Sequence, residues 1–303
     1  RPPLTPPPVG STAEQLIAAA PDGSWINLNI NSFASVLTPS SEQPGGYPQA
    51  VLLAWSSMAW DPIQNELIFW GGGHANYAGN EVYTWSATSL DWERASLPSQ
   101  IVQAGTNSGN FQDIDGVSDA PIASHTYDNN QFLPSLDRFV VFGGAAWDTG
   151  AAFQQVGPNG TYVPTGPYLW NPTLANANEV GGASGSGVNP ATPGGNMWVD
   201  RNTFDTSQPH PSSFIDGVTA TVEENGQDVV YIDDGGGTLW RYAFGAANNG
   251  SQDSYTVAGV ASTAISGMGT GAVDTKDDLF VRTAGNAFMF WNLRSEERRA
   301  GKE

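Results

Sequence analysis

The chain has 303 residues, 30 of them acidic and 11 basic, with a formal net charge of −19 and no cysteine. The missing cysteine excludes disulfides, thiol nucleophiles and thiolate zinc sites, and the charge argues against binding a nucleic-acid backbone, which needs clustered Lys and Arg. The 36 Gly and 21 Pro are accompanied by 11 Trp, 9 Tyr and 13 Phe, which indicates a folded chain rather than a disordered one.

The polar residues indicate where the protein acts. Lysine occurs only at Lys276 and Lys302, whereas Asn, Gly, Ser, Thr and Pro are abundant. This composition is typical of extracellular β-proteins. No apolar run approaches the roughly 18 residues that a membrane helix needs. We therefore expect a secreted or cell-surface protein without a transmembrane segment.

The first 20 residues are predicted to be a proline-rich arm followed by a short helix. Proline fixes φ and lacks a donor, so residues 1–8 (RPPLTPPP) should be extended. The run Thr12–Ala20 (TAEQLIAAA) predicts a helix capped by Ser11 or Thr12.

Residues 54–97 contain four predicted strands separated by turn residues. Gly71-Gly72-Gly73 lies between the second and the third strand. The strands are predicted at Ala54–Trp60, Glu66–Trp70, Glu81–Ser86 and Trp92–Ser96.

Three further units repeat this pattern. The second begins at Ser124, contains Gly143-Gly144 and resumes after a long insertion at Pro167–Trp170. The third has Gly235-Gly236-Gly237 followed by TLWRY, and the fourth stops after its third strand. Four strands, a glycine run after the second and an aromatic in the third are typical of a propeller blade. We predict an all-β propeller over residues 21–293 with about four recognisable blades; the alternative is a β-sandwich.

The segments FWGGGH (69–74), VFGG (141–144) and YTW (83–85) resemble kelch-like β-propellers. These include the central domains of galactose oxidases and several propeller polysaccharide lyases. The resemblance covers residues 50–293 and implies six or seven blades. The copper chemistry of galactose oxidase requires a cysteine-linked tyrosine, so this activity is not expected here.

The last ten residues, 294–303 (RSEERRAGKE), hold many of the few basic side chains. They resemble translated adapter or vector sequence of the kind that ends metagenomic reading frames; the alternative is a solvated charged tail. If the tail is not native, the natural protein continues past Leu293, and open blade edges would favour self-association.

The three histidines are predicted to lie on one face of the propeller. His74 directly follows the first glycine run, so it belongs to a loop between second and third strands. His125 opens an inner strand and His210 precedes the third unit. Loops that connect strands two and three, and loops that enter the next blade, share one face of a propeller.

Groups suited to sugars surround these histidines, because sugars bind flat apolar rings and amide or carboxylate groups. The candidate substrate-binding residues are Asn76, Tyr77, Asn80, Trp147 and His210. Some of them could instead serve turns or interblade packing.

Resemblance to ulvan-lyase-like propellers, which use His, His, Tyr and Arg, implies β-elimination from a uronate. His74, His125 and Tyr127 would act as base and acid, and Arg201 would hold the carboxylate. The expected partner is then an extracellular polysaccharide, although a net charge of −19 repels polyanions. The alternatives are a non-catalytic glycan-binding protein and a self-assembling surface protein.

Hydrolysis and metal binding have weaker signals. Glu81, Asp148 and Asp200 are candidate glycosidase carboxylates, but no spacing identifies a pair. Asp113-Ile114-Asp115-Gly116 with Asp119 is a candidate calcium loop. Asp233-Asp234 and Asp277-Asp278 are weaker candidates of the same kind, and a plain acidic loop is the alternative at all three. No other cofactor is expected.

Overall fold

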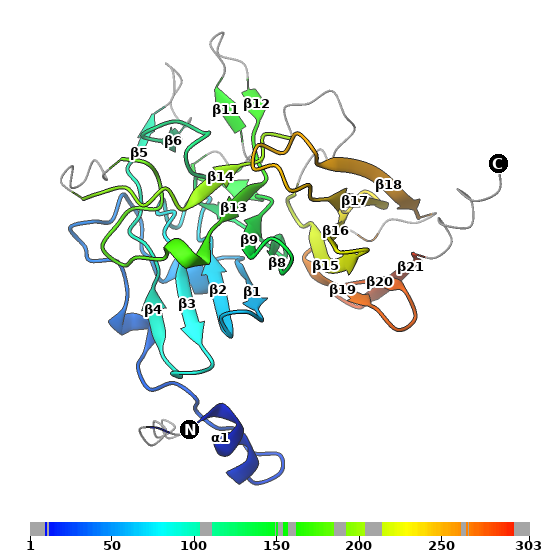
Figure 1. Ribbon diagram of the computed structural model, residues 1–303, viewed down its shortest axis with the longest axis horizontal. Coiled ribbons are helices and arrows are strands. Elements are labelled where there is room, and N and C mark those ends of the chain that lie inside the picture. Colours follow the sequence, from blue (N-terminus) through cyan, green and yellow to red (C-terminus); the bar gives the residue numbers. More distant parts are fainter. Residues whose placement is uncertain are drawn as a thin grey trace.

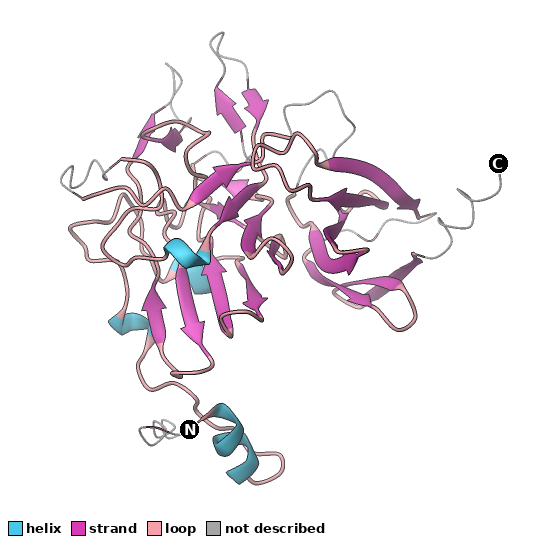
Figure 2. Ribbon diagram, viewed as in Figure 1, coloured by secondary structure: helices cyan, strands magenta, loops and turns pink. Residues whose placement is uncertain are grey.

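The computed structural model describes residues 12–103, 111–148, 165–184, 192–203, 214–261 and 267–293, together with Gly10, Gly150 and Ile265. For residues 154–156 and 162–164 it describes the backbone alone. Strands dominate this part of the chain, which confirms the all-β class (Figure 2). None of its helices is long and apolar enough to cross a membrane. Residues 1–9 and 294–303 lie outside the described residues, so the proposed boundaries of the arm and the tail stay predictions.

The predicted N-terminal helix is α1 (Ala13–Ala19). The Thr12 hydroxyl accepts a hydrogen bond from the Gln15 backbone N–H, and the Gln15 side chain accepts one from Thr12 N–H. This reciprocal capping box satisfies two otherwise unpaired donors, so the helix begins directly after Thr12. The other short helices are η1 (Phe33–Ser35), α2 (Ala50–Leu53) and η2 (Pro172–Leu174).

The first blade is one antiparallel sheet with its strands in chain order. They are β1 (Ser57–Asp61), β2 (Glu66–Trp70), β3 (Tyr83–Ser86) and β4 (Trp92–Arg94). All four match predicted strands, and β2 has the predicted bounds. The first strand begins three residues later than expected because Trp55 has a left-handed φ of 47°, which extended strands do not adopt.

The other blades repeat this meander, with four, four and three strands. Blade two comprises β8 (Asn130–Leu133), β9 (Arg138–Val141), β13 (Tyr168–Trp170) and β14 (Trp198–Asp200). Blade three comprises β15 (Val218–Glu224), β16 (Gln227–Asp233), β17 (Thr238–Ala243) and β18 (Ser254–Val260). Blade four comprises β19 (Gly269–Asp274), β20 (Leu279–Ala284) and β21 (Ala287–Asn292).

The inner strands of successive blades are neighbours. Strand β1 contacts β8, β8 contacts β15, and β15 contacts β19, so the sheets follow one another in chain order (Figure 1). This β-propeller arrangement confirms the predicted fold class and rules out the alternative β-sandwich. Three strand pairs are added at the blade corners: β5 (Ile101–Gln103) with β6 (Phe111–Asp113), β7 (Ser124–His125) with β10 (Ala145–Ala146), and β11 (Gln154–Val156) with β12 (Tyr162–Pro164).

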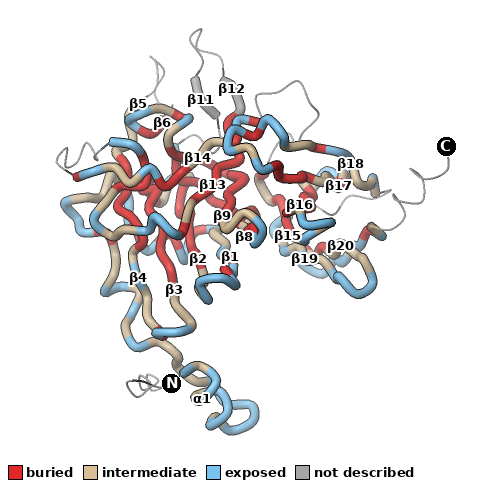
Figure 3. The backbone as a smooth tube through the Cα atoms, viewed as in Figure 1, coloured by how far each residue is buried: buried red, intermediate tan, exposed pale blue. Residues whose placement is uncertain are grey.

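The core is divided between the blade interfaces (Figure 3). Alternate residues of β9 show the division: Phe139 and Val141 pack toward blade one, whereas Val140 and the following Phe142 pack toward blade three. The twofold periodicity of a strand therefore serves two interfaces at once. On the outward faces of the first and last described sheets, Met58, Trp60, Phe288 and Phe290 are exposed. The expected self-association through such surfaces stays a prediction.

Candidate functional site

One residue of the β7–β10 ladder positions both candidate histidines. His125, in β7, lies opposite Ala145 of β10. The carbonyl of the same Ala145 accepts a hydrogen bond of 3.3 Å from the backbone N–H of His74. The loop after β2 of blade one is thereby joined to β10, which follows β9 and is paired with β7, the strand that leads into blade two.

Glycine is required where these segments meet. Gly144 has φ +142°, and a Cβ on it would lie 1.8 Å from the carbonyl oxygen of His125. A Cβ on Gly73 would lie 2.4 Å from the Cα of Ser124. The repeated glycines therefore permit a close approach of the two backbone segments, and this approach brings the two histidines together.

The imidazole rings of His74 and His125 have their centroids 5.5 Å apart at an interplanar angle of 80°. Their predicted placement on one face is thus confirmed. His210 lies outside the described residues. The Nδ1 atom of His74 is buried and has no hydrogen-bond partner among the described residues.

The tautomer of His125 follows from its partner. Asn76 Nδ2 donates to the hydroxyl of Tyr47 over 2.9 Å, and Asn76 Oδ1 lies 2.9 Å from His125 Nε2. Since Oδ1 only accepts, Nε2 carries the proton and Nδ1 keeps a lone pair. Burial, and then the positive charge of His74, lower the pKa of His125 to about 4. His125 is therefore a neutral base at neutral pH.

This pKa is directly measurable. We expect His125 to titrate near pH 4 in a proton NMR titration of the imidazole signals. Asn76→Asp places a carboxylate against Nε2–H, which favours the imidazolium, so the pKa of His125 should rise. The exposed Asn178→Asp is the control and should leave it unchanged. A wild-type His125 titrating near the unperturbed 6.5 would contradict this site.

The lowered pKa of His125 also makes the stability of the folded state depend on pH. Because the pKa of His125 is lower in the folded state, the unfolded chain binds more protons between about pH 6.5 and 4. The stability that this histidine contributes is therefore lost as the pH falls through that window.

Two aromatic side chains extend the cluster. The Trp55 ring lies 4.9 Å from that of His125 and is 52% exposed. The Tyr127 ring lies 6.5 Å from His125, and its backbone N–H donates to Trp55 O over 2.7 Å. Burial, and then the carboxylate of Asp216, raise the pKa of Tyr127, so its hydroxyl keeps its proton. A pocket of about 320 Å³ lies nearby and is lined by Ser56, Met58 and Asp128 among others, but not by the histidines or by these two aromatic residues.

Trp55 and Tyr47 were not among the predicted site residues. A signal for Trp55 exists: it precedes β1 and so occupies the entry to blade one, as His125 does for blade two. Tyr47 carries no such signal, because it joins the cluster only through Asn76.

Two predicted substrate-binding residues belong to the core instead. The Tyr77 side chain is fully buried and donates to Glu81 Oε1 over 2.7 Å. Asn80 is buried, donates to Pro121 O over 2.9 Å and accepts from Ser99 N over 2.8 Å. The prediction that they bind substrate is wrong because neither reaches solvent.

Arg201 is not available to hold a carboxylate. Its guanidinium is buried and pairs with Asp253, with Nε to Oδ2 at 2.9 Å, and Nη2 also donates to Gly245 O over 2.8 Å. Arg201 joins blade two to blade three, so its predicted catalytic role is wrong.

The remaining predicted residues are divided between core and surface. Trp147 is half-buried and packs against the core between blades one and two, while Asp148 is exposed. Glu81 is fully buried and accepts from Thr38, Tyr77 and Tyr83. Asp200 accepts from the backbone of Gly166 and Asn202, so the structure pairs none of these carboxylates for glycoside hydrolysis.

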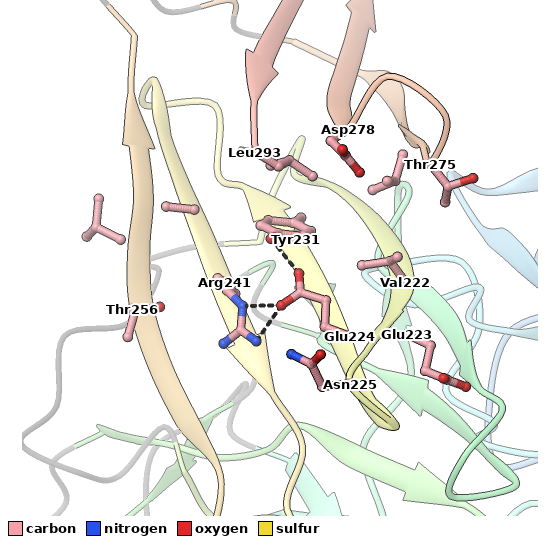
Figure 4. A pocket seen from close by; sticks show the side chains of 13 residues that line it. Val222, Glu223, Glu224, Asn225, Tyr231, Arg241, Thr256, Thr275, Asp278 and Leu293 are labelled. Carbon is pink, nitrogen blue, oxygen red and sulfur yellow. Dashed lines mark hydrogen bonds and ion pairs between the residues drawn. The ribbon is translucent and has the colours of Figure 1, made fainter. Parts of the chain in front are cut away.

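A larger pocket of about 560 Å³ lies elsewhere, between the outer parts of blades three and four (Figure 4). Two of its charged groups, Arg241 and Glu224, bond one another over 2.6 Å, and Glu224 also accepts from Tyr231 over 2.6 Å. A site whose polar groups satisfy each other offers little to a ligand. The histidine cluster is therefore the better candidate.

Comparison with known proteins adds no family to this description. No protein-family model matches the chain, and no curated protein matches its sequence. The likeness to kelch-like propellers accordingly rests on the blade motifs.

Proposed function

We propose that this protein is an extracellular carbohydrate-active propeller that binds a glycan at the histidine cluster and cleaves a uronic-acid-containing chain there by β-elimination. The supporting observation is the pairing of His125, a neutral base, with His74 at 5.5 Å, beside the exposed ring of Trp55. The aromatic face would bind the C–H surface of a sugar, and the imidazoles would perform the proton transfers.

The residues divide the reaction as follows. Nδ1 of His125 removes the C5 proton of the uronate. The electron pair of that C–H bond forms the C4–C5 double bond as the glycosidic oxygen leaves, and the Tyr127 hydroxyl protonates this oxygen. His74, when protonated, supplies the positive charge that faces the carboxylate, in the place that the sequence had assigned to Arg201.

A non-catalytic glycan-binding protein is the second candidate. It is favoured by the net charge of −19, which repels polyanions, and by the engagement of Arg201 with Asp253. Recognition of a neutral glycan would require only Trp55, Asn76 and the neighbouring aromatic side chains.

The experiment is incubation with a panel of uronic-acid-containing and neutral polysaccharides, combined with a retention assay on the same panel. A lyase produces unsaturated ends that absorb ultraviolet light, whereas a hydrolase produces reducing ends without that absorbance. Retention of a glycan without cleavage identifies the binding protein. Absence of both across the panel would contradict the carbohydrate proposal.

Trp55 tests the binding surface by itself. Trp55→Ala should weaken glycan retention about tenfold, because aromatic stacking contributes roughly 1 kcal/mol or more beyond buried area. Trp25→Ala is the matched control, because Trp25 is 77% exposed and belongs to no described contact of the cluster. Equal retention by the two variants would exclude Trp55 from the site.

A further inference from the structure

A cluster of acidic side chains lies in the loop after β6. This loop belongs to the chain segment that connects blade one to blade two. Asp113, the last residue of β6, and Asp115 and Asp119 each present a carboxylate oxygen, and these three oxygens lie within 4.8 Å of one another. Within the described residues, no other group of three His, Asp or Glu side chains is arranged in this way.

The backbone holds the three carboxylates in place. Asp113 Oδ1 accepts from Asp115 N over 2.9 Å, and the carbonyl of Asp113 accepts from Gly116 N over 3.0 Å. A segment of blade two also contributes: Ala183 N donates to Asp119 Oδ2 over 2.9 Å, and Ser184 N donates to Asp115 Oδ2 over 2.8 Å. The loop is thus fixed from both sides before any ligand arrives.

Two buried oxygens of this group, Asp113 Oδ2 and the hydroxyl of Ser99, have no hydrogen-bond partner outside the group among the described residues. Ser99 is 1% exposed, and the Asp113 side chain is fully buried. Ser99 Oγ and Asp119 Oδ2 both lie against Gly182, where an added Cβ would meet them at 3.1 and 2.2 Å. Unsatisfied buried oxygens are rare, and an ion is one of their ordinary explanations.

The charge of the loop calls for the same explanation. In the described part of the chain, all three of the salt bridges involve other carboxylates. Three clustered carboxylates are unfavourable unless a cation compensates them.

We propose that Asp113, Asp115 and Asp119, with Ser99 Oγ, bind a calcium ion that joins blade one to the 182–184 segment of blade two. Calcium takes six to eight oxygen ligands in flexible geometry, and every donor here is a hard oxygen. The weaker acidic pairs do not offer such a site. Asp233 is paired with Arg282 at 2.9 Å, and Asp277 is exposed and belongs to no group of three carboxylates among the described residues.

The test is thermal denaturation of the full chain after treatment with EDTA, followed by titration with calcium chloride or magnesium chloride. The Tm should rise with the logarithm of the calcium concentration, as for any ligand that binds the folded state alone. Magnesium should raise it much less, because it demands a smaller octahedral site. Isothermal titration should give one calcium ion per chain.

Asp115→Asn removes one charge at an exposed position while keeping an oxygen for Ser184 N–H, so it should fold and bind calcium about tenfold more weakly or worse. Asp277→Asn, exposed in blade four, is the matched control and should respond as the wild type. A wild-type Tm that is unaffected by calcium would overturn the site, and so would equal responses of the two variants. If Asp113 and Asp119 instead share a proton, acidification will stabilise the protein and calcium will not. None of these readouts depends on glycan activity.

Discussion

Replacing Arg282 by methionine is expected to lower the free energy of unfolding by about 3–5 kcal/mol. Arg282 is fully buried in β20, and its Nη1 lies 2.9 Å from Asp233 Oδ2 at the end of β16. Its Nη2 donates to Asp216 O over 3.1 Å and to Gly267 O over 2.8 Å. One guanidinium therefore joins blade four to blade three at several points.

Methionine fills much of the volume but leaves the Asp233 carboxylate buried without a counter-charge. Burial already raises the pKa of Asp233, and the charge of Arg282 opposes that rise. In Arg282→Met the pKa should rise further, so the folded state binds a proton that the unfolded state releases. The stability of the variant, relative to wild type, should then be greatest at low pH and fall as the pH increases.

Denaturant unfolding at several pH values measures this effect. Arg241→Met is the matched control, because the Arg241 and Glu224 side chains are 28% and 29% exposed and such pairs contribute at most about 1 kcal/mol. Adding Asp233→Asn to Arg282→Met should recover part of the loss, since it removes the isolated charge. Equal losses in Arg282→Met and Arg241→Met would mean that the buried pair does not hold the blades together.

The strands and the glycine-containing turns after the second strand of each unit could be predicted, because the residues of each short segment determine them. In the run Glu66–Trp70 the residues after Glu66 are all apolar and glycine follows Trp70, so β2 was predicted with its observed bounds. Gly144 and Gly73 follow the second strand of their units, and both sit where a side chain would collide with the neighbouring segment. The meeting of His74 and His125 follows from these two regularities together.

The wrong site residues belong to polar networks that include a residue distant in sequence. Tyr77 donates to Glu81, four residues further on, and the same carboxylate accepts from Thr38, which lies 43 residues before Glu81. Arg201 pairs with Asp253, 52 residues further on. A polar residue in a loop has the same local sequence whether it faces solvent or such a partner, so local patterns could not separate the two cases.

Replacing a histidine of the cluster should have a large effect on the rate of the proposed β-elimination. His125→Ala should lower the rate of β-elimination about 10²–10⁴-fold, the usual contribution of a positioned general base. The loss should fall on kcat, because Trp55 and Asn76 remain to bind the sugar. His74→Ala should likewise abolish the product signal, and Trp25→Ala should not. Activity that survives both histidine changes would reject the assignment.

The pH profile distinguishes a base from a structural histidine. A base acts in its neutral form, so with the pKa of His125 near 4 the rate should hold as the pH falls from neutrality and decline only near pH 4. In Asn76→Asp the same decline should begin at higher pH, because the new carboxylate stabilises the imidazolium. If His125 only supported the packing of Trp55 and His74, Asn76→Asp would change the rate without moving the acidic limb of the profile. The displacement of that limb therefore ties the proton transfer to His125 itself.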